Sequence, residues 1–268
     1  MLGAIIGDIV GSRFEFTNIK TKDFQLFTSH CKVTDDSIMS LAVAKALLES
    51  KSDEELSHTA IKYMQSIGRS YPNCGFGPGF RQWIFSNNPK PYNSFGNGAA
   101  MRISPVGFVA KSLEEAERLA KIVTVVSHNH EEGIKGAVST AAAIFLARCG
   151  QTKKEIKQHI REHYYSFDFT LDSIRDTYSY DPSCQNTVPQ ALEAFFESES
   201  FEDAIRNAIS IGGDSDTLAA ICGSVAQAYY GIPDSIREKA LTYLDKPLLD
   251  MLLEFERMYM NNHVEFND

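Results

Sequence analysis

Two short turns, far apart in the sequence, each combine carboxylates with a hydroxyl where a helix should begin. The first is Thr34-Asp35-Asp36, and the second is Asp214-Ser215-Asp216-Thr217, which follows two glycines. One acidic residue at a helix start is an ordinary cap, because it accepts hydrogen bonds from free N–H groups and favours the helix dipole. Two neighbouring carboxylates, however, repel each other unless a cation lies between them. Helix capping therefore explains one carboxylate in each turn but not the second.

Both turns offer only oxygen ligands, which is typical of Mg²⁺, Mn²⁺ or Ca²⁺ sites and not of zinc sites. Together they carry four carboxylates. This charge suits two divalent ions, and paired ions of this kind serve hydrolytic reactions. The sequence therefore predicts a metal centre at which the two turns meet.

A glycine-rich segment, Ser94–Gly98, is the second candidate for chemistry. Its glycines allow the backbone to approach a ligand, and a helix beginning near Ala99 would direct N–H groups at a phosphate. Phe95 would offer a ring for stacking on a base. Arg102 would either pair with a phosphate or neutralise a buried acid. The same pattern also occurs in simple turns, so it is not specific by itself.

His128 and His130 follow an apolar helix in the stretch Ser127-His128-Asn129-His130. Residues at i and i+2 do not share a helix face, so a zinc pair on a helix is disfavoured. One of these histidines would either contact a substrate or cap the end of a helix.

The elements that must position these groups are predicted to be helices. Gly3, Gly7 and Gly11 recur every four residues, so on a helix they would form a smooth stripe that another backbone can approach closely. Almost no segment alternates with period two. Residues 17–33, most of 71–98 and 167–187 are expected to be loops. Apolar spacing predicts helices over 34–48, 53–68, 79–86, 116–126, 133–148, 153–165, 189–197, 201–211, 218–230, 234–244 and 246–260. The chain is thus predicted to form one all-α domain over residues 1–268.

Local signals place several helix ends. Ser112 with Glu115, and Thr152 with Glu155, predict two capping boxes. Pro189 is expected in the first turn of its helix. The pair Gly212-Gly213 is expected to end the helix before the second acidic turn.

Composition excludes several classes of protein. There are 26 Lys and Arg residues against 35 Asp and Glu, a net charge of −9, which disfavours a nucleic acid as the main partner. The five cysteines have no metal-ligand spacing and suit reduced thiols in the cytoplasm. No stretch is long enough to span a membrane, and the N-terminus has no basic region of a signal peptide. We therefore expect a cytoplasmic protein without a membrane partner.

Taken together, the motifs resemble those of the ADP-ribosylglycohydrolase family, which includes the dinitrogenase-reductase-activating glycohydrolase and the ADP-ribosyl-acceptor hydrolases. The resemblance covers nearly the whole chain, to about Ile232. It rests on the order and spacing of five segments: Gly7–Glu15, Thr34-Asp35-Asp36, Ser94–Arg102, Ser127-His128 and Gly212–Thr217.

This resemblance implies a compact, orthogonally packed helical fold around two Mg²⁺ or Mn²⁺ ions. It implies that six residues bind the metals: Thr34, Asp35, Asp36, Asp214, Asp216 and Thr217. It also implies that Glu15, Asp35 or Asp36 assists proton transfer during hydrolysis. The ADP-ribose cleft would be formed by Ser94, Phe95, Gly96, Asn97, Gly98, Met101 and His128. Phe95 stands where some members have Tyr, so stacking would survive but a hydroxyl contact would be lost.

The implied substrate is an ADP-ribosylated protein or a small ADP-ribose conjugate, and the reaction is hydrolysis of its glycosidic bond. Arginine is the preferred acceptor. Serine, a nucleobase or an acetyl group remain alternatives, because only the acceptor-side loops (17–33, 71–93 and 167–187) would differ. A non-catalytic ADP-ribose-binding relative is the alternative from another class. A helical prenyl synthase would need D-D-x-x-D-like motifs, and none is present.

Overall fold

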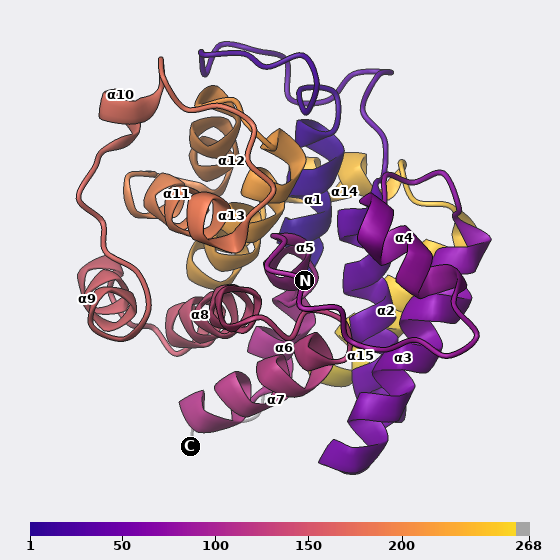
Figure 1. The fold of residues 1–268 in the computed structure, drawn as a ribbon. Coiled ribbons are helices and arrows are strands. Elements are labelled where there is room, and N and C mark those ends of the chain that lie inside the picture. The colour runs from indigo at the N-terminus through magenta and orange to yellow at the C-terminus, as the bar shows by residue number, and fades with distance from the viewer. Residues whose placement is uncertain (261–268) are drawn as a thin grey trace, which may run out of the picture.

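A computed structural model describes residues 1–260 of the chain, and all regular elements among them are α-helices (Figure 1). The described residues contain one isolated β-bridge, between Gly96 and Ser183, and no strand. The all-α prediction is therefore confirmed. The predicted domain of 1–268 includes residues 261–268, which lie outside the described residues. The helices are α1 (Leu2–Gly11), α2 (Asp35–Glu49), α3 (Asp53–Ser70), α4 (Pro78–Phe85), α5 (Gly98–Met101), α6 (Ser104–Val109), α7 (Leu113–Val125), α8 (Glu131–Arg148), α9 (Lys153–His163), α10 (Leu171–Ile174), α11 (Cys184–Phe196), α12 (Phe201–Ser210), α13 (Ser215–Tyr230), α14 (Asp234–Leu241) and α15 (Lys246–Tyr259).

Helices α1 and α13 form the centre of the fold, because the glycine stripe of α1 lies directly against the backbone of α13. A Cβ atom added at Gly3 would lie 2.1 Å from the carbonyl oxygen of Gly223, and one at Gly7 would lie 2.0 Å from that of Ala219. A Cβ at Gly11 would lie 2.5 Å from Cα of Asp216. As residue numbers rise along α1 they fall along α13, so the two helices are antiparallel. The end of α1 is therefore next to the start of α13.

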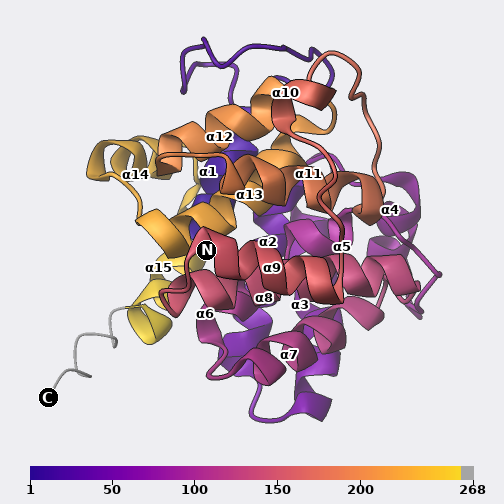
Figure 2. The same ribbon diagram turned by 90° about the vertical axis from the view of Figure 1, so that its left-hand side faces the viewer.

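The other helices pack around this pair. Helices α2, α3 and α4 lie on one side of it in Figure 1, and α11 and α12 lie on the other. Helix α14 packs on α1 and α15 packs on α2, and Figure 2 shows both at the edge of the molecule opposite α4. The apolar faces meet in one continuous core that includes Leu2, Leu41 and Phe195. A membrane-spanning helix requires a long apolar run, and no helix within residues 1–260 has one.

Most predicted helix ends are confirmed. The Thr34 side chain caps α2 by accepting a hydrogen bond from the Asp36 N–H, and Thr152 and Glu155 form the expected capping box. Gly212 and Gly213 follow α12 with φ of 71° and 75°, values that favour glycine. The predicted capping box of Ser112 and Glu115 is only half formed. The Ser112 hydroxyl accepts from the Glu115 N–H, but the Glu115 carboxylate accepts from the Lys111 N–H and not from that of Ser112.

The predicted position of Pro189, in the first turn of its helix, is wrong. Pro189 lies inside α11, which begins five residues earlier at Cys184. The reason is tertiary: the Cys184 N–H donates to the carbonyl of Phe95, and Ser183 forms the β-bridge with Gly96. These contacts fix the backbone before the proline and allow the helix to start there.

Candidate metal centre and cleft

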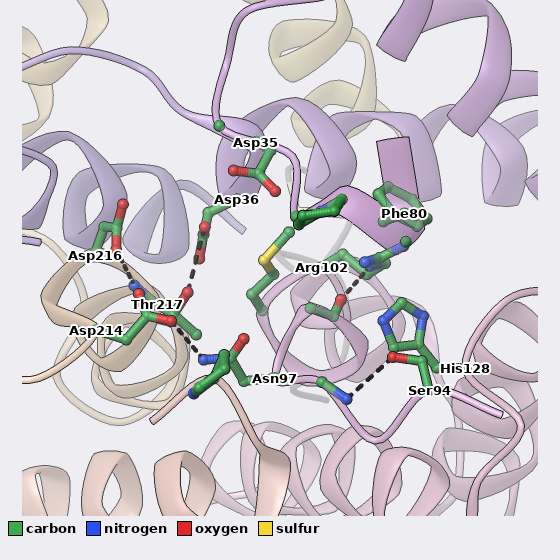
Figure 3. A pocket seen from close by; sticks show the side chains of 18 of the residues that line it. Asp35, Asp36, Phe80, Ser94, Asn97, Arg102, His128, Asp214, Asp216 and Thr217 are labelled. Atoms are coloured by element: carbon green, nitrogen blue, oxygen red, sulfur yellow. Dashed lines mark hydrogen bonds between the residues drawn. The ribbon is translucent and has the colours of Figure 1, made fainter. Parts of the chain in front are cut away.

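A cleft of about 220 Å³ opens between the starts of α2 and α13 and the glycine-rich segment before α5 (Figure 3). In this view the carboxylates lie on one side of the cleft, while Phe80, Arg102 and His128 lie on the other. Most of the predicted site residues line it: Glu15, Asp35, Asp36, Ser94, Gly96, Asn97, Gly98, Met101, His128, Asp214, Asp216 and Thr217. Thr34 and Phe95 are not among the lining residues.

The two acidic turns meet at the base of the cleft. The Thr217 hydroxyl donates to Oδ2 of Asp36 across 3.4 Å. Carboxylate oxygens of Asp8, Asp36 and Asp216 lie within 4.8 Å of one another, and so do those of Glu15, Asp214 and Asp216. Asp216 belongs to both groups. The acidic residues are therefore arranged as two overlapping clusters, each of which could hold a cation.

The donor set fits hard divalent cations. Oδ1 of Asp36 is buried and has no hydrogen-bond partner among the described residues. Within residues 1–260, none of the clustered carboxylates forms an ion pair with Lys, Arg or His. Buried, unpaired carboxylates are costly, and an oxygen-binding metal would remove that cost.

The same crowding raises the pKa values of the acids. Burial raises the pKa of Glu15 to about 7, with contributions from Asp214 and Asp35. Burial, followed by the charge of Asp8, raises the pKa of Asp35 to about 7. The pKa values of Asp36 and Asp216 are raised well above their ordinary value by burial and by neighbouring carboxylates. Burial and mutual repulsion therefore favour the protonated form of these acids, whereas a bound cation would favour their charged form.

Asp8 has a role at this site that the sequence analysis did not assign. Its fully buried carboxylate accepts from the Thr34 hydroxyl at 2.6 Å, the Thr34 N–H at 3.0 Å and the Ser37 N–H at 3.1 Å, and also from the Ser37 hydroxyl. It therefore fixes the first turn of α2, which carries Asp35 and Asp36. A charged residue inside the apolar run of α1 was the signal that could have identified it.

Thr34 contributes to the same arrangement from outside the cleft. Its hydroxyl donates to Asp8, and its oxygen accepts from the Asp36 N–H at 3.4 Å. The structure thus places Thr34 between Asp8 and the two acids of α2.

The glycine-rich segment is hydrogen-bonded to the acidic cluster. Nδ2 of Asn97 donates to Oδ2 of Asp214 at 2.7 Å and to the hydroxyl of Thr187 at 3.2 Å. The Ser94 hydroxyl accepts from the Gly96 N–H at 3.2 Å. Asn97 therefore orients a carboxylate of the acidic cluster, and Figure 3 shows it directly beside Asp214.

A helix does start next to the predicted position near Ala99, because α5 begins at Gly98. Helix α5 is a single turn, and the N–H groups of Ala99 and Ala100 donate to the carbonyls of Gly96 and Asn97. These two N–H groups are therefore not available to a phosphate.

His128 and Phe95 have different surroundings. His128 is buried in the cleft wall, and its Nδ1 lies 2.8 Å from the hydroxyl of Ser127. Burial, followed by the charge of Arg102, lowers its pKa well below the usual value, so the ring is neutral. The Phe95 ring is 47% exposed and packs edge-on against His130, with ring centroids 5.2 Å apart.

Arg102 is buried in the wall of the cleft and forms no ion pair among the described residues. Its guanidinium lies 4.1 Å from the ring centroid of Phe80 and donates to the carbonyl of Gly98. Burial lowers its pKa to about 10, against the charges of Tyr92, Asp35 and Asp36. Its charge therefore acts on the buried acids Asp35 and Asp36 through space, and its side chain lines the cleft.

Several lining residues were not predicted individually. They come from the loops that the sequence analysis assigned to the acceptor side, and their types and spacing carry no signal of their own: Gly75, Gly77, Pro78, Gly79, Phe80, Tyr92, Tyr180 and Pro182.

A family model and several relatives match most of the chain. A family model described as ADP-ribosylglycohydrolase matches residues 1–262. ADP-ribosylhydrolase ARH3 of Homo sapiens is 23% identical, covering 93% of this chain and 90% of that protein. The ADP-ribosyl-dinitrogen reductase glycohydrolase of Rhodospirillum rubrum is 24% identical, with coverage of 87% and 85%. The ADP-ribosylarginine hydrolase Tri1 of Pseudomonas putida is 26% identical, with coverage of 87% and 70%.

The fold is also found among solved structures. A chain described as an ADP-ribosylglycohydrolase-related protein complex superposes with a TM-score of 0.69 and 21% identity, covering 97% of this chain and 96% of that one. This likeness supports the helical architecture alone, whereas the family model covers the site residues as well. The chain belongs to the ADP-ribosylglycohydrolase family of enzymes.

Proposed function

We propose that the protein is a divalent-metal-dependent hydrolase that releases ADP-ribose from arginine side chains of proteins. The observation that carries the metal part of the proposal is the pair of carboxylate clusters that share Asp216. Asp35, Asp36, Asp214, Asp216 and Thr217 line the same cleft, and Thr34 lies directly behind it. These six residues would hold two Mg²⁺ or Mn²⁺ ions. The ions would supply charge to orient the ribose hydroxyls and to stabilise negative charge on oxygen during the reaction.

The residues of the chain itself have distinct tasks in this proposal. Glu15 is the acid that we assign to proton transfer, because its carboxylate lines the cleft beside those of Asp214 and Asp216, and in the metal-free protein burial raises its pKa to about 7. Asp35 has a similarly raised pKa and is the next candidate. Asn97 holds Asp214 in place. The neutral ring of His128 would form a hydrogen bond with the ADP-ribose without adding charge.

Arginine is favoured as the acceptor by the charge of the cleft. Five carboxylates line it, those of Glu15, Asp35, Asp36, Asp214 and Asp216. Two divalent ions would compensate four of these charges, so the cleft would keep a negative charge and would attract a cationic guanidinium more strongly than a neutral serine hydroxyl. The name of the Pseudomonas putida relative, an ADP-ribosylarginine hydrolase, agrees with this choice.

The test is a panel of ADP-ribose conjugates linked to arginine, serine, a nucleobase or an acetyl group, assayed with Mg²⁺, with Mn²⁺ and with EDTA. We expect the arginine conjugate to give the highest kcat/KM and EDTA to abolish turnover. Preference for another conjugate would overturn the acceptor assignment, and full activity in EDTA would overturn the metal mechanism. A thermal shift with ADP-ribose but no turnover of any conjugate would identify a binding protein instead.

A further inference from the structure

We propose that Asn18 is a positioning residue that holds the acid Glu15 against the metal-binding turn of α13. This inference rests on the proposed function. Asn18 lies in the loop after α1, three residues beyond Glu15. The carboxylate oxygens of Glu15 and Asp214 lie within 4.8 Å of each other, although the two residues are far apart in the sequence.

The side-chain amide of Asn18 bonds to the backbone on both sides of this junction. Its Oδ1 accepts from the Gly213 N–H at 2.8 Å, and its Nδ2 donates to the Gly213 carbonyl at 2.9 Å. The same Nδ2 lies 2.7 Å from the carbonyl of Phe14 and 3.1 Å from that of Glu15. One side chain therefore connects the backbone of Glu15 to the residue that directly precedes Asp214.

The glycine pair makes this approach possible. Gly212 and Gly213 both have positive φ, and a Cβ added at Gly212 would lie 3.1 Å from Oδ1 of Asn18. Lys20 adds a second connection beside the first, because its Nζ donates to the carbonyls of Ile211 and Tyr178, each at 2.6 Å. The turn of α13 is thus held by two side chains of the loop that carries Glu15.

Glu15 depends on this connection because no regular element contains it. Helix α1 ends at Gly11, and residues up to Thr34 form no further helix. A group that transfers protons must be held within a fraction of an ångström of its working position, and residues outside the first shell of a metal site serve this purpose. Asn18 is itself exposed, so its substitution should leave the fold intact.

The experiment compares Asn18→Ala with wild type and with Lys22→Ala. Lys22 lies on the same loop, where it pairs with Asp203 and does not line the cleft. For Asn18→Ala we expect kcat and Mn²⁺ affinity each to fall by about tenfold, as for other outer-shell substitutions. ADP-ribose affinity should change by less than about twofold, since the substitution removes no cleft contact. Hydrogen exchange at the Gly213 N–H should accelerate. For Lys22→Ala all four quantities should match wild type.

Two results would overturn the inference. One is Asn18→Ala with wild-type kcat and Mn²⁺ affinity despite faster exchange at Gly213, which would make the contact purely structural. The other is an equal loss in Lys22→Ala, which would point to general loosening of the loop. If wild type turned over no ADP-ribose conjugate, the proposed function would fail, while Mn²⁺ affinity and Gly213 exchange would still decide the role of Asn18.

Discussion

The hydroxyl of Thr217 lies 3.4 Å from Oδ2 of Asp36, so the first turns of α13 and α2 meet although 181 residues separate them. Helix α1 makes this contact possible. Asp8 accepts four hydrogen bonds from the start of α2, and Gly11 lies against the backbone of Asp216. The candidate metal centre is therefore assembled on the C-terminal half of α1.

Replacing Asp216 by Asn should lower turnover without lowering the thermal stability of the metal-free protein. Asp216 belongs to both carboxylate clusters, so turnover should fall by more than about 100-fold, since even outer-shell substitutions around metals cost up to about that much. In EDTA the variant should have a Tm equal to or above that of wild type, because one of several mutually repelling buried acids is gone. Turnover assays and thermal unfolding with and without Mn²⁺ measure both effects. The control is Asp168→Asn, at a carboxylate that is 73% exposed, and it should behave as wild type. A lower Tm of Asp216→Asn than of wild type in EDTA would contradict the repulsion argument.

The metal-free protein should lose stability as pH rises. The pKa values of Glu15 and Asp35 are raised from 4.5 and 3.8 to about 7 in the folded state. At pH values between the ordinary pKa and the folded-state pKa of about 7, the folded state binds more protons than the unfolded state. The free energy of unfolding therefore decreases as pH rises through this window. Urea titrations in EDTA across this window should show the decrease. Saturating Mn²⁺ should weaken or reverse it. The double variant Glu15→Gln with Asp35→Asn should make the decrease smaller and leave the part that Asp36 and Asp216 contribute. Stability that increases with pH in EDTA would show that these pKa values are not raised.

Gly7→Ala should destabilise the fold. The added Cβ would lie 2.0 Å from the carbonyl oxygen of Ala219, and backbone cannot yield as a flexible side chain does. Overpacking of this kind costs about 1–3 kcal/mol or more in the free energy of unfolding. Gly77→Ala is the matched control, since no atom lies within 4 Å of its added Cβ and its φ is −56°. Chemical denaturation of both variants makes the comparison, and equal stabilities would show that α1 and α13 are not in close backbone contact.

Asp8→Asn should weaken both the fold and metal binding. In wild type, hydroxyl and N–H groups of Thr34 and Ser37 donate to the Asp8 carboxylate. The amide of the variant keeps one acceptor oxygen, but its NH₂ group would face some of these donors and could not accept from them. Each buried donor left unsatisfied costs about 1–3 kcal/mol. Because α2 carries Asp35 and Asp36, Mn²⁺ affinity should also fall by about tenfold or more.

Ser37→Ala is the control for Asp8→Asn, since it removes one donor and leaves the Thr34 contacts in place. It should lose less stability and less Mn²⁺ affinity, as measured by denaturation and calorimetry. An Asp8→Asn variant that bound Mn²⁺ like wild type would contradict the role of Asp8 in placing the start of α2.

The helical class, the two acidic turns and the glycine stripe could be predicted because they depend on local chemistry. A cap acts within one helical turn, and apolar spacing reflects the helix period. Thr34 and the pair Gly212-Gly213 therefore behave as expected. Asp216 and Asp36 could be identified as candidate ligands from their types alone.

Only the tertiary structure decided which partners these local elements meet. The antiparallel contact of α1 with α13, the four hydrogen bonds of Asp8 and the reach of Asn18 to Gly213 all join segments that are distant in the sequence. The early start of α11 and the position of Phe95 outside the cleft lining have the same origin. Such contacts arise from close packing of whole helices, which no window of neighbouring residues encodes.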